Sequence, residues 1–189
     1  MAQFAILSGR NGHRIAESAI RAISRQLPAQ RQVIRARPDL VVILAHAEWE
    51  TAPAQEWQEG DSEGSLLLGP VQDDPYQAIP ASELLASKPR LTRAPWPSLG
   101  VAWDQSKTRV LNDPIGVRGV WWATTPHCNL VASTPTLVLA HPDVPRRPNL
   151  GVVGERLSYR PTTRHETVYE GLRLLGPGAM LTLLSLIHI

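Results

Sequence analysis

The sequence contains a single cysteine, Cys128, and this scarcity excludes two classes of small protein. One thiol cannot form an internal disulfide, and it cannot supply the several thiolates of a structural zinc site. The chain therefore suits a reducing compartment, and we expect a cytoplasmic protein. No apolar run reaches the roughly 18 residues that a membrane-spanning helix needs, and the N-terminus lacks the basic and then apolar order of a signal peptide. We expect no membrane partner.

Charge of either sign is also sparse. The 189 residues include 19 basic and 17 acidic ones, which gives a formal net charge of +2. Only Arg146 and Arg147 are adjacent basic residues, so the sequence predicts no nucleic-acid partner. Six acidic residues fall between positions 48 and 63, but they lack regular ligand spacing and predict a solvated loop rather than a metal site.

The N-terminal part of the chain has the periodicities of regular structure. With 43% hydrophobic residues, a chain of this length can bury one core, so we expect one domain. Three segments predict strands: residues 3–7, 31–35 and 40–45. Apolar residues recur at helical spacing over residues 13–27, which predicts an amphipathic helix capped by Asn11 and ended by Pro28.

The most informative stretch covers residues 100–133. Three segments predict successive antiparallel strands: residues 100–104, 109–123 and 129–133. The hydrophilic break at residues 105–108 has the length of a hairpin loop. Within the second segment, Pro114 fixes φ and Gly116 tolerates a positive φ, so we expect a tight corner at residues 113–116.

Four side chains around this stretch are candidates for special contacts. Asp113 and Arg118 flank the corner, so we expect an ion pair or hydrogen bonds to the turn backbone, with contact to a following domain as the functional alternative. His127 and Cys128 are neighbours, and neighbouring residues of a strand point to opposite faces. They are therefore poorly placed as base and nucleophile, and a hairpin turn is expected there.

The remaining segments give weaker patterns. Residues 48–96 are rich in Pro, Gln, Glu and Asp, with an apolar island at 66–68 and a candidate helical turn at 82–86. Two helices and a strand are expected downstream: residues 134–140 with Thr134 as N-cap, residues 149–157 with Leu150, Val153 and Leu157 on one side, and a strand from Met180. Residues 184–189 match the translation of a sequencing-library adaptor, so we exclude them from the domain at residues 1–183 and expect the natural protein to continue.

Three motifs occur in order in the second half of the chain. The first covers residues 111–118, reads Leu-Asn-Asp-Pro-Ile-Gly-Val-Arg and is followed by two tryptophans. The second covers residues 130–142 and reads Leu-Val-Ala-Ser-Thr-Pro-Thr-Leu-Val-Leu-Ala-His-Pro. The third covers residues 167–178 and reads Thr-Val-Tyr-Glu-Gly-Leu-Arg-Leu-Leu-Gly-Pro-Gly. They resemble Asp-x-x-Gly-Ile/Val-Arg/Lys-Pro-Leu-Tyr-Tyr, Leu-Phe-Ala-Ser-Glu-x-x-Ala-Leu-Leu-Ala-His-Pro and Thr-x-Phe-x-Gly-Ile-x-x-Leu-x-Pro-Gly. These are segments of the N-terminal class II glutamine amidotransferase-like domain of the asparagine synthetase family, whose relatives include β-lactam synthetases and lasso peptide cyclases.

The resemblance implies a fold and a set of motif residues. It implies an α+β fold, an αββα sandwich of the N-terminal nucleophile hydrolase type with antiparallel sheets between helical layers. Seven residues occupy positions of the family motifs and are expected to be structural or interdomain rather than catalytic: Asp113, Gly116, Arg118, Ser133, Gly171, Pro177 and Gly178.

The sequence departs from the family where the glutaminase chemistry would be. Family members expose an N-terminal cysteine, whose thiol attacks glutamine, but here the second residue is Ala2, which has no thiol. Residues 48–96 contain no equivalent of the family's Asn-Gly-Glu-Ile-Tyr-Asn segment, which forms the oxyanion hole. The arginine segment that binds the glutamine carboxylate is also unmatched. We therefore predict an inactive glutaminase site.

The resemblance then implies a role in a larger enzyme. Such an enzyme adenylates a carboxylate and joins it to an amine, with ATP and Mg²⁺ bound by a synthetase domain absent from this chain and no cofactor in this domain. Without ammonia from glutamine, an amine on the substrate is preferred, as in β-lactam synthetases or in lasso cyclases that act on a precursor peptide. The alternatives are a non-catalytic scaffold or peptide-binding module, a glutamine-hydrolysing asparagine synthase domain, and an amidase with another nucleophile.

Overall fold

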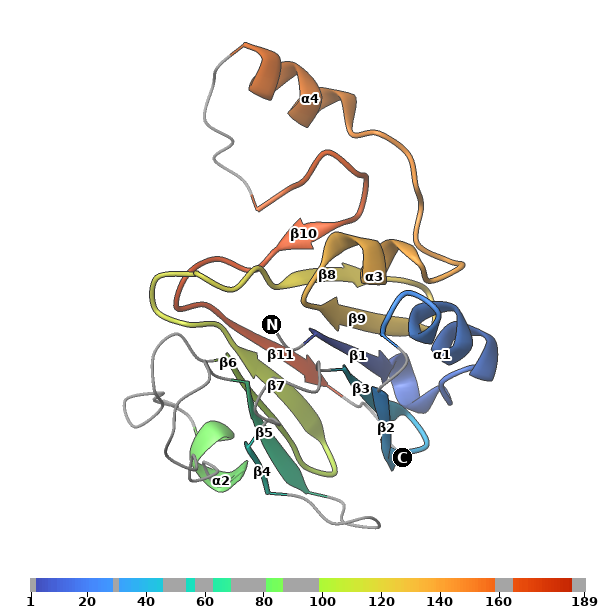
Figure 1. Ribbon diagram of the computed structural model, residues 1–189, viewed down its shortest axis with the longest axis vertical. Coiled ribbons are helices and arrows are strands. Elements are labelled where there is room, and N and C mark those ends of the chain that lie inside the picture. Colours follow the sequence, from blue (N-terminus) through green and yellow to red (C-terminus); the bar gives the residue numbers. More distant parts are fainter. Residues whose placement is uncertain are drawn as a thin grey trace.

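Two antiparallel β-sheets lie face to face, with helices against their outer faces (Figure 1). The computed structural model describes residues 3–28, 31–45, 54–56, 63–68, 81–86, 99–158 and 165–184, and the backbone alone at 54–56. The predicted α+β class is confirmed, and so are the antiparallel sheets between helical layers. Among the described residues, no helix combines the length and hydropathy needed to cross a lipid bilayer.

The first sheet has six strands with the N-terminal strand inside it. Their spatial order is β10 (Arg173–Leu174), β8 (Trp121–Thr124), β9 (Cys128–Ala132), β1 (Gln3–Gly9), β3 (Leu40–Ala45) and β2 (Arg31–Arg37). β1 pairs antiparallel with β9 on one side and with β3 on the other, so that Ala5 lies between Ala132 and Ile43. The strand nearest the N-terminus is thus held by two neighbours.

The second sheet has five strands from the middle and the end of the chain. Their order is β11 (Met180–Leu184), β7 (Lys107–Leu111), β6 (Leu99–Trp103), β5 (Gly64–Leu68) and β4 (Ala54–Glu56). The apolar island of residues 66–68 therefore forms a strand. The expected final strand is confirmed as β11, which includes Leu184 and pairs it with Lys107. Residues 185–189 lie outside the described residues.

The stretch at residues 100–133 forms four strands rather than three. β6 pairs with β7 in the second sheet, and β8 pairs with β9 in the first. The expectation of successive pairing is wrong between β7 and β8, because they belong to different sheets. Residues 112–120, which we call the crossing segment, carry the chain from one sheet to the other. The predicted corner lies within it.

Four α-helices and one short 3-10 helix are described. They are η1 (Arg10–Gly12), α1 (Glu17–Ser24), α2 (Ala81–Leu84), α3 (Pro135–Leu139) and α4 (Leu150–Leu157). α3 is capped by Thr134 as predicted. The predicted cap of α1 is wrong: Asn11 lies in η1 with φ of 53°, and Ala16 precedes α1 without a side-chain cap.

The predicted apolar side of α4 is not buried. Leu150 and Leu157 are 75% and 76% exposed, and Val152 is the residue that packs inward. Asn149 caps this helix by accepting a hydrogen bond from the Val152 N–H at 3.3 Å. In Figure 1, α4 lies away from the two sheets, at the opposite end of the molecule from β2. The helix therefore forms where it was expected, but Leu150 and Leu157 are exposed to solvent.

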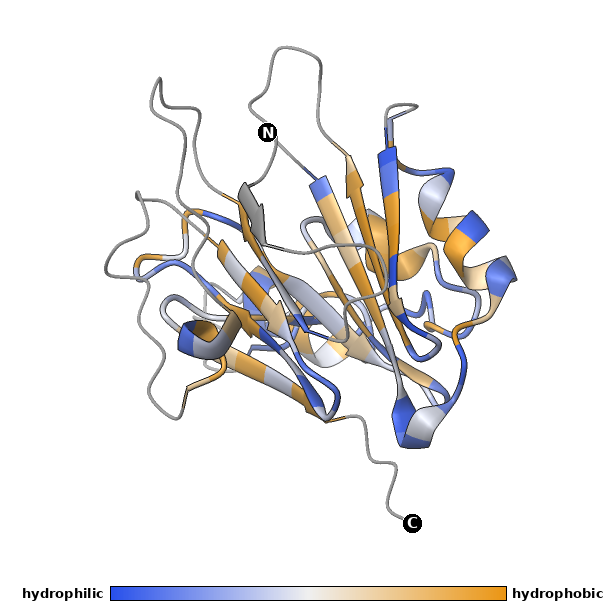
Figure 2. Ribbon diagram, turned by 90° about the horizontal axis from the view of Figure 1, so that it is seen from below, coloured by the Kyte–Doolittle hydropathy of each residue, from blue (hydrophilic) through white to orange (hydrophobic). Residues whose placement is uncertain are grey.

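The core is built in layers by the alternation of side chains along the strands. On β1, Phe4 and Ile6 point between the two sheets, whereas Ala5 and Leu7 point toward α1 and α3. Two-residue alternation of this kind places every second side chain on one face of a strand. A third cluster joins α2 to the outer face of the second sheet. Figure 2 shows hydrophobic residues concentrated between the sheets and on the inner side of α1.

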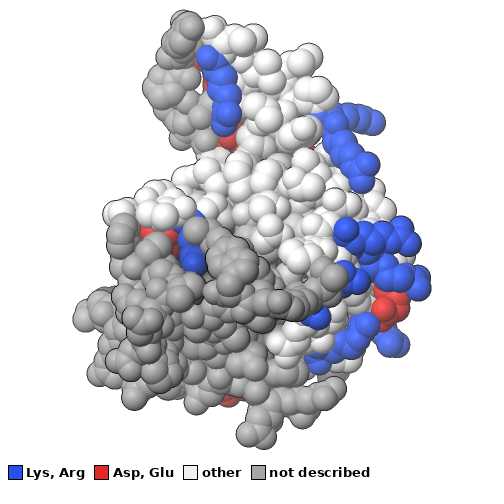
Figure 3. All heavy atoms as spheres, in the orientation of Figure 1, with Lys and Arg blue, Asp and Glu red and all other residues white. Residues whose placement is uncertain are grey.

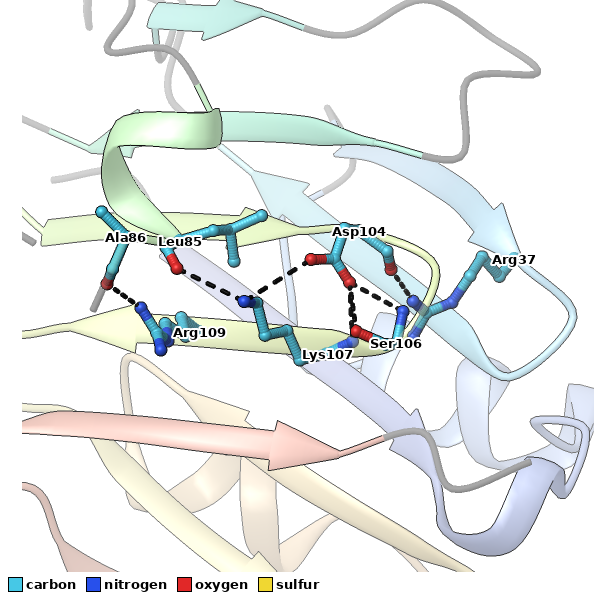
Figure 4. Close-up of polar contacts among 7 residues, drawn as sticks. All are labelled: Arg37, Leu85, Ala86, Asp104, Ser106, Lys107 and Arg109. Atoms are coloured by element: carbon cyan, nitrogen blue, oxygen red, sulfur yellow. Dashed lines mark hydrogen bonds and ion pairs between the residues drawn. The ribbon is translucent and has the colours of Figure 1, made fainter. Parts of the chain in front are cut away.

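The β6–β7 hairpin connects the two sheets at one edge (Figure 4). Asp104 Oδ1 accepts hydrogen bonds from the Ser106 N–H at 2.7 Å, the Ser106 hydroxyl at 2.8 Å and the Lys107 N–H at 2.9 Å. The backbone oxygen of Asp104 accepts a hydrogen bond from Arg37 of β2. Burial raises the pKa of Asp104, but the hydrogen bonds from Ser106 and Lys107 and the Lys107 charge outweigh it and lower the pKa. The charged carboxylate therefore holds the hairpin in shape.

We predict that Asp104→Ala lowers the free energy of unfolding by about 1–3 kcal/mol, because three donors of the hairpin lose their acceptor. Urea denaturation followed by circular dichroism measures this change. Glu155→Ala on the exposed side of α4 is the matched control, since it removes a carboxylate without hairpin contacts. Equal stability of the two variants would contradict the role given to Asp104.

Candidate functional site

The carboxylate of Asp113 organises the crossing segment. Its side chain is fully buried. Oδ1 accepts hydrogen bonds from the N–H groups of Ile115 and Val117, both at 3.1 Å, and Oδ2 accepts one from the N–H of Arg118 at 3.0 Å. A buried carboxylate is tolerated when backbone donors satisfy it in this way. Of the two contacts expected for Asp113, the structure has hydrogen bonds to the turn backbone.

The first and third family motifs pack directly against one another. The Asn112 amide donates to the carbonyl oxygens of Leu175 and Gly176, both at 3.1 Å. The Gly178 N–H donates to the carbonyl oxygen of Asp113 at 2.8 Å. These bonds fasten the crossing segment to the chain that leads into β11, so two motifs distant in sequence form one structural unit.

Two glycines of this unit are required by the backbone, and one of them is also required by space. Gly116 has φ of +69°, and a Cβ there would lie 2.8 Å from Pro177 Cγ. Gly178 has φ of +60°. Side chains other than hydrogen are strained at such φ values. The motif residues Gly116 and Pro177 therefore meet at one close contact, whereas a Cβ on Gly178 would lie 3.7 Å from Pro114 Cα.

The same turn presents two apolar side chains to solvent. Ile115 is 61% exposed and Val117 is 52% exposed, although their backbone N–H groups are held by Asp113. Arg118, at the end of the turn, is buried. A rigid backbone therefore displays two exposed β-branched side chains at the crossing between the sheets.

Ser133 fixes the start of the chain. Its Oγ accepts a hydrogen bond from the Phe4 N–H at 3.1 Å, and its N–H donates to the Phe4 carbonyl oxygen at 3.1 Å. These bonds continue the β1–β9 pairing to the beginning of β1. Ala2 lies outside the described residues, two positions before Phe4. The clamp on Phe4 thus fixes the beginning of β1 within the first sheet.

Gly171 lies apart from the other motif residues. It has φ of +73° in the turn before β10, and a Cβ there would lie 3.8 Å from Pro145. It contributes to neither the crossing segment nor the Ser133 clamp. The predictions on the family's oxyanion-hole segment and on the six acidic residues concern residues 48–96. Of these, 54–56, 63–68 and 81–86 are described, and the rest lie outside the described residues.

The structure brings together a thiol and an imidazole that the sequence analysis did not pair. Cys128 Sγ lies 3.5 Å from His141 Nε2, and both side chains are buried. His141 Nδ1 accepts a hydrogen bond from the Asp143 N–H at 3.2 Å. An imidazole that accepts at Nδ1 carries its proton on Nε2, so in this geometry Nε2 is a donor toward the sulfur and not a base.

Burial keeps this pair uncharged. It raises the pKa of the Cys128 thiol, against a hydrogen bond with Thr125, and the negative charge of Asp143 acts in the same direction as burial. Burial lowers the pKa of His141 and outweighs the opposing effect of Asp143. A neutral thiol is a poor nucleophile. The arrangement therefore does not activate Cys128 as a nucleophile.

A hollow of about 230 Å³ lies beside this pair, and its wall includes His13 and His127. Their rings meet edge to face, with centroids 5.4 Å apart. Within the described ranges, no group of three or more His, Cys, Asp or Glu side chains is placed to hold a metal ion. The hollow thus has imidazole and thiol groups without the geometry of a metal centre.

No protein-family model matches this chain, and no curated protein matches it. Among solved structures, the chain is similar to the glutamine phosphoribosylpyrophosphate (PRPP) amidotransferase from B. subtilis, complexed with ADP and GMP. The two share 10% sequence identity with a TM-score of 0.46. The match covers 100% of this chain and 50% of that one, so this chain spans about half of the enzyme's length.

We predict that Asp113→Ala lowers the free energy of unfolding by about 3 kcal/mol or more, since three backbone N–H groups, one of them buried, lose a charged acceptor. Asp113→Asn keeps one acceptor oxygen and is expected to cost about 1–3 kcal/mol. Chemical denaturation ranks the two variants against Ile115→Ser, an exposed substitution expected to change stability by less than about 0.5 kcal/mol. Similar stability of all three variants would contradict the role of Asp113.

The lowered pKa of His141 predicts a pH dependence of stability. The unfolded chain binds a proton at His141 near the ordinary pKa of 6.5, whereas the folded chain binds it only at lower pH. The free energy of unfolding therefore has a contribution that is present above that value and is lost as pH falls through the lowered pKa. Denaturation at several pH values measures this loss, and His141→Gln is expected to remove it. An unchanged pH dependence in the variant would refute this assignment.

Proposed function

We propose that this chain is the N-terminal, glutaminase-like domain of an ATP-dependent amide-forming enzyme and that its glutaminase site is inactive. The observation that carries the proposal is Ala2 at the position of the family nucleophile. A methyl group cannot attack an amide carbon, and it has no proton to transfer. The hydrogen bond from the Phe4 N–H to Ser133 Oγ holds the strand two residues after Ala2, which is compatible with this proposal.

The cysteine at position 128 is not placed to take over the role of that thiol. Cys128 is the one cysteine of the chain, and it belongs to the cluster between the first sheet and its helices, not to the space between the sheets. Its neighbour His141 offers a proton rather than a lone pair. An amidase based on this pair is therefore disfavoured.

The crossing segment suits contact with a following synthetase domain. Ile115 and Val117 are exposed apolar residues on a backbone that Asp113 holds rigid. Burying such side chains against a partner stabilises the contact with little ordering cost, because the turn is already fixed. We assign these two residues to the interdomain surface.

The domain that follows would bind ATP and Mg²⁺ and activate a carboxylate. Because Ala2 releases no ammonia, the amine belongs to the substrate in this proposal. A lasso cyclase that acts on a precursor peptide, or a β-lactam synthetase that acts on a small molecule, is preferred. A glutamine-hydrolysing asparagine synthase would need the missing thiol and is the less favoured family member.

We predict that the purified chain releases no ammonia or glutamate from glutamine above the rate in buffer. A coupled glutamate assay measures the rate, and a cooperative thermal transition by circular dichroism shows that the sample is folded. Release by the wild-type chain would overturn the inactive site. If Cys128→Ser abolished that release, the nucleophile would be Cys128.

A further inference from the structure

Arginines that are dispersed in the sequence gather on one face of the fold. Residues 10–37 contain seven arginines and one glutamate. They run through α1 and β2, which lie close together at one side of the molecule (Figure 1). In Figure 3 the blue groups collect on this side around a small red group. The surface is rich in guanidinium groups, which bind carboxylates with two parallel hydrogen bonds.

β2 is the terminal strand of the first sheet. Among the described strands it pairs with β3 alone, so no described strand pairs with the backbone groups of its other edge. Ile34 points between the sheets. Arg31 and Val33 point to the side of α1 by strand alternation, and Val33 is 38% exposed. Such an edge is a template for an added strand.

Positive charge on this edge selects among the strands that it can accept. If a second copy of β2 paired antiparallel here along its whole length, Arg31 would face Arg37 of that copy, and like charges in that position are unfavourable. The charge thus guards against self-pairing. The same arginines attract a strand that carries carboxylates at alternate positions.

A hollow at the end of β2 adds a place for a carboxylate. Its volume is about 390 Å³, and Arg14, Arg35 and Arg37 contribute to its wall. Arg37 is held by Asp39 at 3.0 Å and by the Asp104 backbone oxygen. Arg35 forms a half-exposed ion pair with Glu17 at 2.9 Å, and such pairs exchange at small cost. Arg14 and Arg31 have no carboxylate partner among the described residues.

We propose that β2 binds an acidic, extended peptide segment of a partner protein by strand addition. The backbone edge supplies the main-chain hydrogen bonds, and Arg14 and Arg31 receive the carboxylates of the segment. A peptide is favoured over a nucleic acid because the edge offers alternating N–H and C=O groups, which a phosphate backbone cannot match in register. This inference does not depend on the inactive glutaminase site, so either proposal can fail alone.

The test uses the full chain and a fluorescein-labelled peptide that alternates Glu and Thr and matches β2 in length. Fluorescence anisotropy is expected to show saturable binding that weakens as salt rises. The double variant Arg14→Glu and Arg31→Glu is expected to weaken binding by about tenfold or more. The matched control is Arg147→Glu with Arg156→Glu, which makes the same charge change near α4 and is expected to bind as the wild type does.

Peptide methylation separates strand addition from charge attraction. Two forms of the peptide carry N-methyl groups on alternate backbone nitrogens, one form on each set, with the charge unchanged. Strand addition predicts that only the form methylated on the set facing β2 loses binding. Equal binding of both forms, or no binding of the parent peptide, would overturn the proposal. Tighter binding of single-stranded DNA than of the peptide would also overturn it, in favour of a nucleic-acid surface.

Discussion

The buried carboxylate of Asp113 is the interaction on which the joining of the two sheets depends. A chain that leaves one sheet and enters the other breaks off its strand pairing, so the backbone N–H groups of the turn need other acceptors. Asp113 accepts three of them, and its own carbonyl oxygen accepts the N–H of Gly178. The turn and the approach to β11 are therefore set by one residue, and the packing of Gly116 on Pro177 follows from it.

Local sequence patterns could predict most of the elements but not how they pair. Alternation and apolar runs gave β1, β3 and β11, and the proline and glycine gave the corner. A local pattern does not predict that β7, before the corner, and β8, after it, enter different sheets. Their pairing is decided by distant partners, β11 for β7 and β10 for β8. The helix cap at Asn11 was wrong since residues 10–12 form a separate 3-10 turn, in which the Arg10 N–H donates to the His127 carbonyl oxygen of the β8–β9 connection.

In the candidate site, too, contacts within one turn could be predicted from the sequence, whereas contacts between distant elements could not. The motif at residues 111–118 indicated a buried Asp113, since aspartate beside a proline turn has backbone donors within reach. The pairing of Cys128 with His141 was missed, because their contact depends on how α3 docks on β9, and the adjacent His127 is exposed instead. The arginines of α1 and β2 also looked unremarkable in sequence. They form one surface only in the folded protein, in which α1 and β2 lie close enough for Glu17 to pair with Arg35.

The place of β1 inside the first sheet has a consequence for biosynthesis. The hydrogen bond from Phe4 to Ser133 joins residues 129 positions apart. When the chain emerges from the ribosome, β1 can pair with β3 early, but its other edge stays open until β9 has been made. Long-range pairing of this kind slows folding and exposes apolar strands meanwhile. A nascent chain of this fold therefore needs protection from aggregation until its second half has been translated.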